Sequence, residues 1–503
     1  MDLVSRSCLF LSVALFTAVS GASTAQAGPL MAGVARVDIS NPDAGKPNDP
    51  IYARALVLKD DARTVVLVTL DAVAIAEIGS IKNEYLGNVR ASLAKELKIE
   101  PSHLLVNASH CHAIVCADVE QRTVQAVKEA HKNLVPVTAG VGVGHEDRIQ
   151  ENRRLLMKSG KTIDIRRAYS LPPDDQVAAV GPIDPQIGIL RLDRKDGKTL
   201  AVVYNFACHP IEGVPSGGNT ADLTGFSSKS IEDAFDDVTM AFFVQGCGGD
   251  INPIRYKDVT TPQDAEPLGN LLALSTIKAA KRIQCGDVAP MKVVHEKLDL
   301  PRADLAERIE QSEAETLRLM RSLRATNLNL KSFMALVPRY AGSEFPADPS
   351  YRYLHEKMLG RNNLAKLDAR NRADVEAYLS NVYTMEELTR VQTNLALLKK
   401  HQAQNIAAGK RTVEVEVNGL RLGDFVLVTF PGELTVQIGL NIKKTSPHKN
   451  TFVAGYTNGY IYYAPTSEQL KNVGGAQEDS DCILAPEWHP LFEAKVAEVL
   501  KGL

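Results

Sequence analysis

The sequence predicts a mixed-sheet α/β or α+β domain that is interrupted by a long helical insertion. Between residue 30 and about residue 300, short apolar runs alternate with amphipathic segments, which is typical of strands and helices around one largely buried sheet. Residues 303–409 are instead rich in Leu, Ala, Glu, Arg and Lys, and these residues favour helices. Strand-like runs return after residue 410, so we expect the same sheet to resume behind the insertion.

Each predicted element before the insertion follows from its hydrophobic period. Runs of apolar and β-branched residues predict strands at residues 53–59, 64–70, 104–109, 200–206 and 238–244. Apolar residues at helical spacing predict helices at residues 82–97, 123–132 and 227–235.

The insertion and the chain behind it are predicted in the same way. Strong helical patterns predict two helices, at residues 303–325 and 373–408. Because proline interrupts helices, Pro338, Pro346 and Pro349 predict a loop between them. Two further strands are predicted at residues 411–419 and 424–430.

The charge balance argues against a nucleic-acid partner. The 503 residues include 57 Lys and Arg and 60 Asp and Glu, which gives a formal net charge of -3. A chain without a basic excess is poorly suited to neutralise phosphates. With 45% hydrophobic and 23% charged residues, the composition is that of a globular protein rather than a disordered or fibrous one.

The first 27 residues have the features of a signal peptide. Arg6 supplies a positive charge, residues 8–19 form an apolar segment, and residues 25–27 form an A-x-A cleavage site. No later apolar run reaches the roughly 18 residues that a membrane helix needs. We therefore expect one mature domain, residues 28–503, that is secreted or periplasmic and has no transmembrane segment; an N-terminal anchor is the alternative. Six cysteines would remain, which permits disulfides in an oxidising compartment.

Four segments with chemically active side chains come at or after the ends of predicted strands. His110 and His112 stand two residues apart, so on an extended backbone they point to the same side. His209 follows the predicted strand at residues 200–206. The glycine-rich residues 245–253 follow the strand at 238–244, and Glu433 follows the strand at 424–430. The glycines allow the backbone to approach a neighbour closely, and Asp250 within this segment could orient a histidine. We expect the four segments to share one cleft.

The order of these motifs resembles that of the neutral (alkaline, non-lysosomal) ceramidase family. Seven segments carry the resemblance, collinear along most of the mature chain. They include Ala-Ser-His-Cys-His at residues 108–112, Asn-Phe-Ala-Cys-His-Pro at 205–210 and Pro-Gly-Glu at 431–433. The others lie at residues 32–40, 152–154, 248–253 and 458–463.

The resemblance implies a zinc amidase that splits N-acyl-sphingosine into a fatty acid and sphingosine. By motif, the family's four zinc ligands fall on His110, His209, Glu433 and Tyr463, with Tyr460 as a competitor for the last position. Zinc accepts two imidazoles, a carboxylate and a phenolate, and this set leaves a position for a water whose pKa the ion lowers.

The resemblance also implies functional side chains around the metal. His112 falls on the family's non-ligand histidine near the substrate amide, where it could assist proton transfer or stabilise an oxyanion. Arg153 falls on the arginine of the Asn-Arg motif and suits substrate binding, because a guanidinium stays protonated; a surface arginine is the alternative. Tyr460 is a further catalytic candidate. Asp222 is either a supporting residue of the site or a loop cap.

The sequence departs from the family in three places. Asn252 stands where the family has a serine that is proposed to act at the substrate amide. An asparagine cannot be an alkoxide nucleophile, although it can donate a hydrogen bond. No C-terminal immunoglobulin-like domain is expected, because the chain ends about forty residues after Tyr463. The insertion at residues 303–409 has no counterpart that we can match.

The sequence therefore predicts an exported zinc-dependent hydrolase that cleaves the amide bond of a lipid or small-molecule N-acyl substrate by a zinc-activated water. The chain contains no G-x-S-x-G, H-E-x-x-H or Walker A motif, which argues against several commoner hydrolase classes. The alternatives are a zinc-dependent esterase, a lyase that acts on a sugar acid, and a non-catalytic homologue that keeps the pocket for binding.

Overall fold

The fold is described here from a computed structural model. It describes residues 29–165, 171–235, 238–256, 258–340, 347–472 and 475–503. The predicted signal peptide, residues 1–27, lies outside the described residues. Among the residues described, none of the helices combines the length and the apolar character needed to cross a bilayer.

The larger sheet has eight strands and is mixed, as the sequence predicts. From edge to edge the strands are β12 (Met240–Gln245), β11 (Thr199–Phe206), β10 (Gln186–Arg194), β5 (Val135–His145), β1 (Met31–Asp38), β2 (Tyr52–Lys59), β3 (Thr64–Leu70) and β4 (Leu104–Ala108). The outer pairs β11–β12 and β3–β4 are parallel, and the pairs between them are antiparallel. The strands β4 and β11, which the two histidine motifs follow, therefore belong to the two parallel pairs.

The strands behind the insertion do not resume this sheet, so that expectation is wrong. They form a second, four-stranded sheet in the order β14 (Lys292–Pro301), β15 (Thr412–Leu422), β16 (Phe425–Thr429) and β18 (Thr451–Ala454). The reason lies in β14, which ends just before the insertion and pairs with β15 so that Pro301 faces Thr412. The insertion thus leaves and re-enters one antiparallel pair, and that pair starts a sheet of its own.

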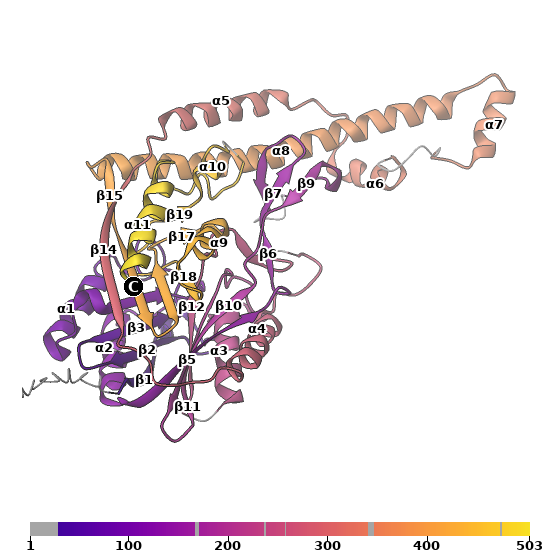
Figure 1. The fold of residues 1–503 in the computed structure, drawn as a ribbon. Coiled ribbons are helices and arrows are strands. Elements are labelled where there is room, and N and C mark those ends of the chain that lie inside the picture. The colour runs from indigo at the N-terminus through magenta and orange to yellow at the C-terminus, as the bar shows by residue number, and fades with distance from the viewer. Residues whose placement is uncertain (1–28, 166–170, 236–237, 257, 341–346, 473–474) are drawn as a thin grey trace, which may run out of the picture.

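The two sheets pack face to face between outer layers of helices (Figure 1). In β2, Leu56 and Leu58 join the core between the sheets, whereas Ala55 and Val57 face the other way, as the two-residue period of a strand requires. Helices α1 (Tyr85–Leu97), α2 (Val119–Lys132), α3 (Asp222–Ala234) and α4 (Ala265–Ala280) cover the larger sheet. Helices α9 (Val436–Thr445) and α11 (Trp488–Gly502) pack on the smaller one.

Three small sheets, two of them strand pairs, hold the loops at the ends of the two large sheets. These are β6 (Gln150–Asn152) with β13 (Ile251–Pro253), β17 (Glu433–Leu434) with β19 (Tyr463–Ala464), and the sheet of β7 (Arg154–Met157), β8 (Thr162–Asp164) and β9 (Val177–Val180). The remaining elements are α10 (Ser467–Leu470) and 3-10 turns at Pro42–Ala44, Pro101–His103 and Asp174–Gln176. All six cysteines of the described chain are free thiols.

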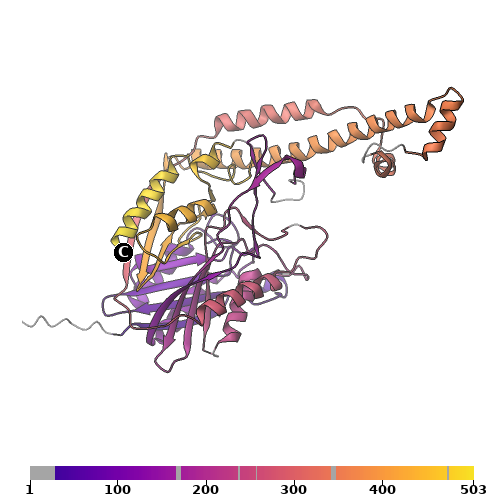
Figure 2. The same ribbon diagram turned by 45° about the vertical axis from the view of Figure 1, so that its right-hand side comes forward.

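The predicted insertion forms a helical arm that projects from the sandwich (Figures 1 and 2). It consists of α5 (Ala306–Ser322), α6 (Leu330–Tyr340), α7 (Ser350–Met358) and the 45-residue α8 (Asn363–Ala407). The predicted loop between the outer helices is wrong, because α6 and α7 form there and α8 begins ten residues before the predicted helix.

Pro349 is compatible with a helix because it immediately precedes α7, where a missing N–H costs nothing. Pro338 lies inside α6 and removes the hydrogen bond that residue 338 would donate to the carbonyl of Met334, and α6 ends two residues later. Phe333 and Tyr340 of α6 pack against Val375 of α8, and this small core stabilises the distal part of the arm. Pro346 lies outside the described residues.

Candidate metal centre

His110 is held in one orientation by the backbone around it. The residue follows β4 in a left-handed turn with φ of 69°, and its N–H donates to the carbonyl of Ala72. Its Nδ1 lies 2.6 Å from the carbonyl oxygen of Val73. Because a carbonyl only accepts, Nδ1 carries the proton, and the lone pair of Nε2 faces the site.

His209 is oriented by the same device on another strand. The residue follows β11, and both its N–H and its Nδ1 bond the carbonyl of Ile251, at 3.0 and 3.1 Å. Its Nε2 therefore also points inward, toward the carboxylate of Glu433 at 3.1 Å. The structure assigns the orienting role to backbone carbonyls, not to Asp250. That carboxylate instead accepts from the backbone N–H of Val436 at 2.7 Å and from the Asn152 amide at 3.3 Å.

Glu433 completes a compact buried group with the two histidines. One ligand atom from each of His110, His209 and Glu433 lies within 4.8 Å of the others, and all three side chains are buried. Tyr456 donates to Oε2 of Glu433 at 3.2 Å, and Tyr460 donates to Oε1. Three of the four predicted ligands thus lie close enough together to be candidates for holding one cation.

The electrostatics of this group keep the carboxylate charged and the His110 imidazole neutral. Burial by itself would raise the pKa of Glu433, but the neighbouring His110, His209 and Tyr460 hold that pKa well below its usual range. Burial lowers the pKa of His110 to about 4, although the charge of Glu433 opposes this shift. Burial and the same charge raise the pKa of Tyr456 and Tyr460, so both keep their hydroxyl protons and act as donors.

The side-chain amide of Gln245 fixes the distance between the two histidines. Its Nε2 donates to the carbonyl of Ser109 at 3.1 Å and to that of Cys208 at 2.7 Å, the residues that directly precede His110 and His209. Its Oε1 accepts from the backbone N–H groups of Cys208 and Gly246. We call this arrangement the Gln245 clasp.

The close backbone approach predicted for the glycine-rich segment is made to the strand that carries Glu433. The N–H of Gly249 donates to the carbonyl of Leu434 at 2.9 Å. A Cβ at Gly249 would lie 2.6 Å from the carbonyl oxygen of Glu433, so a larger residue would push β17 away. Gly249 is therefore required for the position of the carboxylate.

The two competing tyrosines have different places. The hydroxyl of Tyr463 lies 3.5 Å from Nε2 of His209 and accepts from Arg153 at 3.2 Å. Tyr460 instead contacts Oε1 of Glu433, while both histidines approach Oε2. Tyr463 is thus the tyrosine beside the open lone pair of His209, and Tyr460 supports the far oxygen of the carboxylate.

Arg153 is a buried positioning residue, and the alternative of a surface arginine is wrong. Its side chain is 1% exposed. The guanidinium donates to Glu478 at 2.6 Å, to Asn252 Oδ1 at 3.1 Å, to Tyr463, and to the carbonyl of Gly249. It therefore ties together two predicted site residues and the backbone beneath Glu433.

Asn252 and His112 lie beside this group. Asn252 is buried, and because a guanidinium only donates, its Oδ1 must be the atom that faces Arg153. Its Nδ2 is then turned away and has no hydrogen-bond partner among the described residues. His112 is exposed, with its ring edge-on to that of His110 at 5.6 Å between centroids.

Sequence reasoning missed three supporting residues and left one open. It assigned no role to Tyr456, Gln245 or Glu478, which lie in loops or at strand ends. The hydrogen-bond partners of Gln245 and Glu478 include residues more than a hundred positions away in the sequence. The dipeptide Asn458-Gly459 is typical of a turn, and it was the sequence feature that could have drawn attention to the segment containing Tyr456. Asp222 is a loop cap, since its carboxylate accepts from the N–H groups of Gly213 and Leu223, both at 2.7 Å.

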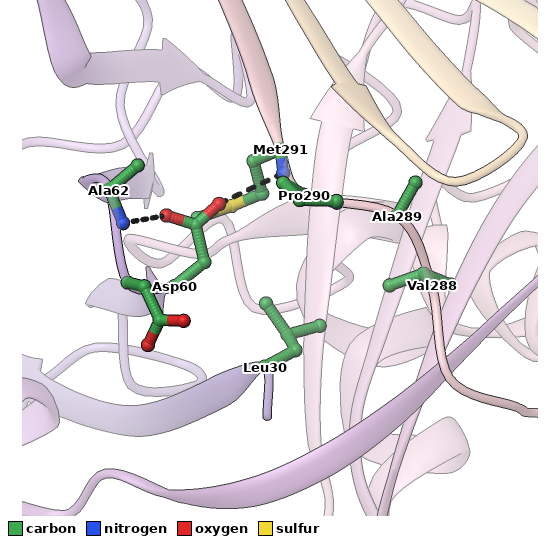
Figure 3. A pocket seen from close by; sticks show the side chains of 8 residues that line it. Leu30, Asp60, Ala62, Val288, Ala289, Pro290 and Met291 are labelled. Carbon is green, nitrogen blue, oxygen red and sulfur yellow. Dashed lines mark hydrogen bonds between the residues drawn. The ribbon is translucent and has the colours of Figure 1, made fainter. Parts of the chain in front are cut away.

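Figure 3 shows a pocket that lies away from this group, at the opposite end of the larger sheet. Asp60 stands in the turn before β3, whereas His110 follows β4, which runs parallel to β3. The carboxylate of Asp60 accepts from the N–H groups of Ala62 and Met291, at 2.9 and 3.0 Å. Apart from the carboxylates of Asp60 and Asp61, the pocket has an apolar lining, and it contains no histidine.

Two solved structures share this architecture. A ceramidase complexed with C2 is 16% identical, with 94% of this chain and 75% of that chain covered at a TM-score of 0.58. The neutral ceramidase of Pseudomonas aeruginosa is 15% identical, with the same coverage and a TM-score of 0.56. No family model and no curated protein matches the sequence. The chain therefore has the fold of the neutral ceramidases, which confirms at the level of structure the resemblance that its motifs indicate.

We expect Gln245→Leu to weaken metal binding by about 10- to 100-fold, because Gln245 orients both histidine segments. Loss of the donor also leaves the carbonyls of Ser109 and Cys208 unpaired, which costs about 1–3 kcal/mol of unfolding free energy. Zinc titration and urea unfolding measure the two effects. Gln125→Leu, on the exposed face of α2, is the control; equal zinc affinity in Gln245→Leu would contradict the clasp.

The neutral state of His110 predicts a pH-dependent stability for the metal-free protein. The unfolded chain takes up the imidazole proton below its ordinary pKa of 6.5, whereas the folded chain does so only near pH 4. The unfolding free energy therefore falls as the pH is lowered, and this group contributes about 2 kcal/mol of loss between pH 7 and pH 5. Urea unfolding of chelator-treated protein at both pH values checks this. The difference between wild type and His110→Gln isolates the group, and a difference that does not change with pH would contradict it.

Proposed function

We propose that this protein is an exported, zinc-dependent hydrolase that cleaves the amide bond of an N-acyl substrate. The observation that carries the proposal is the buried His110–His209–Glu433 group. The fold of the chain is shared with a ceramidase complexed with C2 and with a neutral ceramidase. This likeness supports a substrate whose scissile amide bond lies next to an acyl chain. Export rests on residues 1–27 and their signal-peptide features.

The donor set fits zinc. Two imidazole Nε2 atoms and one ionised carboxylate are ligands that zinc prefers, and the Tyr463 hydroxyl lies close enough to His209 to join them. Both imidazoles have their Nδ1 atoms bonded to backbone carbonyls, the support that zinc-binding histidines generally have. A zinc ion bound there supplies a Lewis acid, which polarises a carbonyl group and lowers the pKa of a water.

The residues around the donor set have separate roles in this proposal. Tyr456 and Tyr460 hold the two oxygens of Glu433, so the carboxylate keeps one orientation. Arg153 positions Tyr463 and Asn252 with the same guanidinium group. His112, exposed next to His110, is placed to transfer a proton to the departing amine.

Asn252 supplies a substrate-binding donor in the place of the family's serine. Its Nδ2 is buried and unpaired in the described structure, a state that costs free energy unless the donor has a use. An amide N–H that meets the substrate carbonyl oxygen would satisfy it and would stabilise negative charge on that oxygen during the reaction. This role requires no side-chain nucleophile.

Metal dependence is tested with zinc-loaded protein and a panel of N-acyl-sphingosines, N-acyl amino acids and sugar esters. We expect release of a carboxylic acid from the N-acyl compounds, loss of activity after chelation, and recovery with zinc. His209→Ala should lose both stoichiometric zinc and turnover, while His145→Ala, at an exposed histidine, should keep both. Full activity in metal-stripped protein would exclude the proposal, and ester hydrolysis alone would favour an esterase.

Asn252→Asp is the sharpest test of the donor role. An aspartate keeps an oxygen for Arg153 and has nearly the same shape, but it removes the Nδ2 donor. We expect normal zinc content and a turnover rate lowered by about 10²–10³-fold, the usual effect of losing one such donor. Asn252→Ala should behave in the same way. Unchanged turnover in both variants, or stoichiometric labelling of wild type by a serine-directed fluorophosphonate, would contradict this role.

A further inference from the structure

The distal helix of the arm presents an apolar face to solvent. Tyr351, Leu354 and Met358 of α7 are spaced i, i+3 and i+7, so they form one stripe along the helix. Their exposed fractions are 64%, 61% and 84%. Leu359, the next residue, is exposed as well. A globular protein rarely leaves such a stripe uncovered without a partner for it.

The stripe faces outward because α7 is attached to α8 through polar groups. The hydroxyl of Tyr353 donates to Asp368 of α8, and Glu356 accepts from the N–H of Leu364 at 2.8 Å. Tyr353 and Glu356 are three residues apart, on a face different from the apolar stripe. The usual arrangement, with the apolar face toward the protein, is thus reversed.

Basic side chains lie beside the stripe and on the neighbouring turns of α8. Residues 347–372 contain six Lys and Arg and three Asp and Glu, in a chain whose net charge is -3. The three acidic groups are all engaged within the arm: Asp348 by Arg352, Glu356 by Leu364, and Asp368 by two tyrosines. Lys357 and Arg361, which flank Met358, are exposed. An apolar face with a basic rim complements a surface that is apolar beneath a layer of negative charge.

We propose that the arm tip, defined as α7 with residues 359–361, docks on a lipid bilayer that carries anionic headgroups. The apolar stripe enters the boundary between headgroups and acyl chains, while Lys357 and Arg361 meet the phosphates. Helix α8 spans about 70 Å at 45 residues, and Figures 1 and 2 show α7 at its outer end, away from the sandwich. The tip can therefore reach a membrane without the core blocking it.

Vesicle co-sedimentation tests the proposal with the full mature chain. We expect binding to phosphatidylcholine vesicles that contain phosphatidylglycerol and much weaker binding to pure phosphatidylcholine vesicles. Leu354→Glu with Met358→Glu should lower the partition coefficient by at least about tenfold, since two apolar insertions are lost. Lys357→Glu with Arg361→Glu should lower it on the anionic vesicles by about fivefold per charge, and added salt should mimic this change.

Ile406→Glu is the matched control, because Ile406 is 70% exposed on α8, at the end of that helix remote from α7. It should bind vesicles as wild type does. Wild type that leaves both kinds of vesicle unbound overturns the proposal, and so does equal binding by the tip variants. Self-association that Leu354→Glu with Met358→Glu abolishes, measured by sedimentation velocity without lipid, would show that a second copy covers the stripe. Because co-sedimentation needs no turnover, its result is independent of the proposed amidase activity.

Discussion

The geometry of the site depends on one side-chain amide, that of Gln245. Two histidines can share a cation only if the strands that precede them are held at a fixed separation, and no direct contact between β4 and β11 provides this in the sheet order. The Gln245 amide joins the carbonyls before His110 and before His209 and leaves its oxygen for the backbone of its own turn. The backbone N–H of Gln245 in turn donates to Asn107 at 2.8 Å, which draws together the two edges of the larger sheet.

Asn107 extends this constraint to the second sheet. Its Nδ2 donates to the carbonyl of Gly455 and to the hydroxyl of Thr457, while Asn458 exchanges hydrogen bonds with Val106 and Leu104 of β4. Tyr456, Asn458 and Tyr462 all have positive φ, a conformation that costs about 1–3 kcal/mol for each such residue. These buried polar contacts hold the segment in that conformation, and the segment delivers Tyr456, Tyr460 and Tyr463 to Glu433 and His209.

The sequence located the candidate ligands His110 and His209 because both lie just past a strand. The apolar runs before His110 and His209 are unambiguous, and the motif order adds Glu433 and Tyr463. Gln245, Tyr456 and Glu478 escaped prediction because their importance comes from pairings between distant segments, such as Arg153 with Glu478, which hydrophobic period does not encode. The second sheet was missed for the same reason, since the register of β14 with β15 spans the whole insertion. In the arm, the prolines predict a break, yet α7 begins directly after Pro349 and α6 continues for two residues past Pro338, so both helices form.

The two ends of the arm have different relations to the site. At its base, Gln404 of α8 donates to the hydroxyl of Tyr462 at 2.7 Å, His401 contacts Asp481, and Arg308 of α5 donates to the carbonyl of Asp479. Asp479 and its neighbour Glu478 bind Arg154 and Arg153, so the base of the arm supports the same network that positions Tyr463.

The distal helices α6 and α7 have their own small core with α8. They contact α8 near Asp368 and Val375, more than twenty residues before His401 and Gln404 at the base of the arm. Removal of the whole insertion would therefore disturb the metal centre, whereas substitutions on α7 leave its supports in place. The fold thus combines an arm base that supports the His110–His209–Glu433 group with a remote tip whose surface chemistry can change without altering that group.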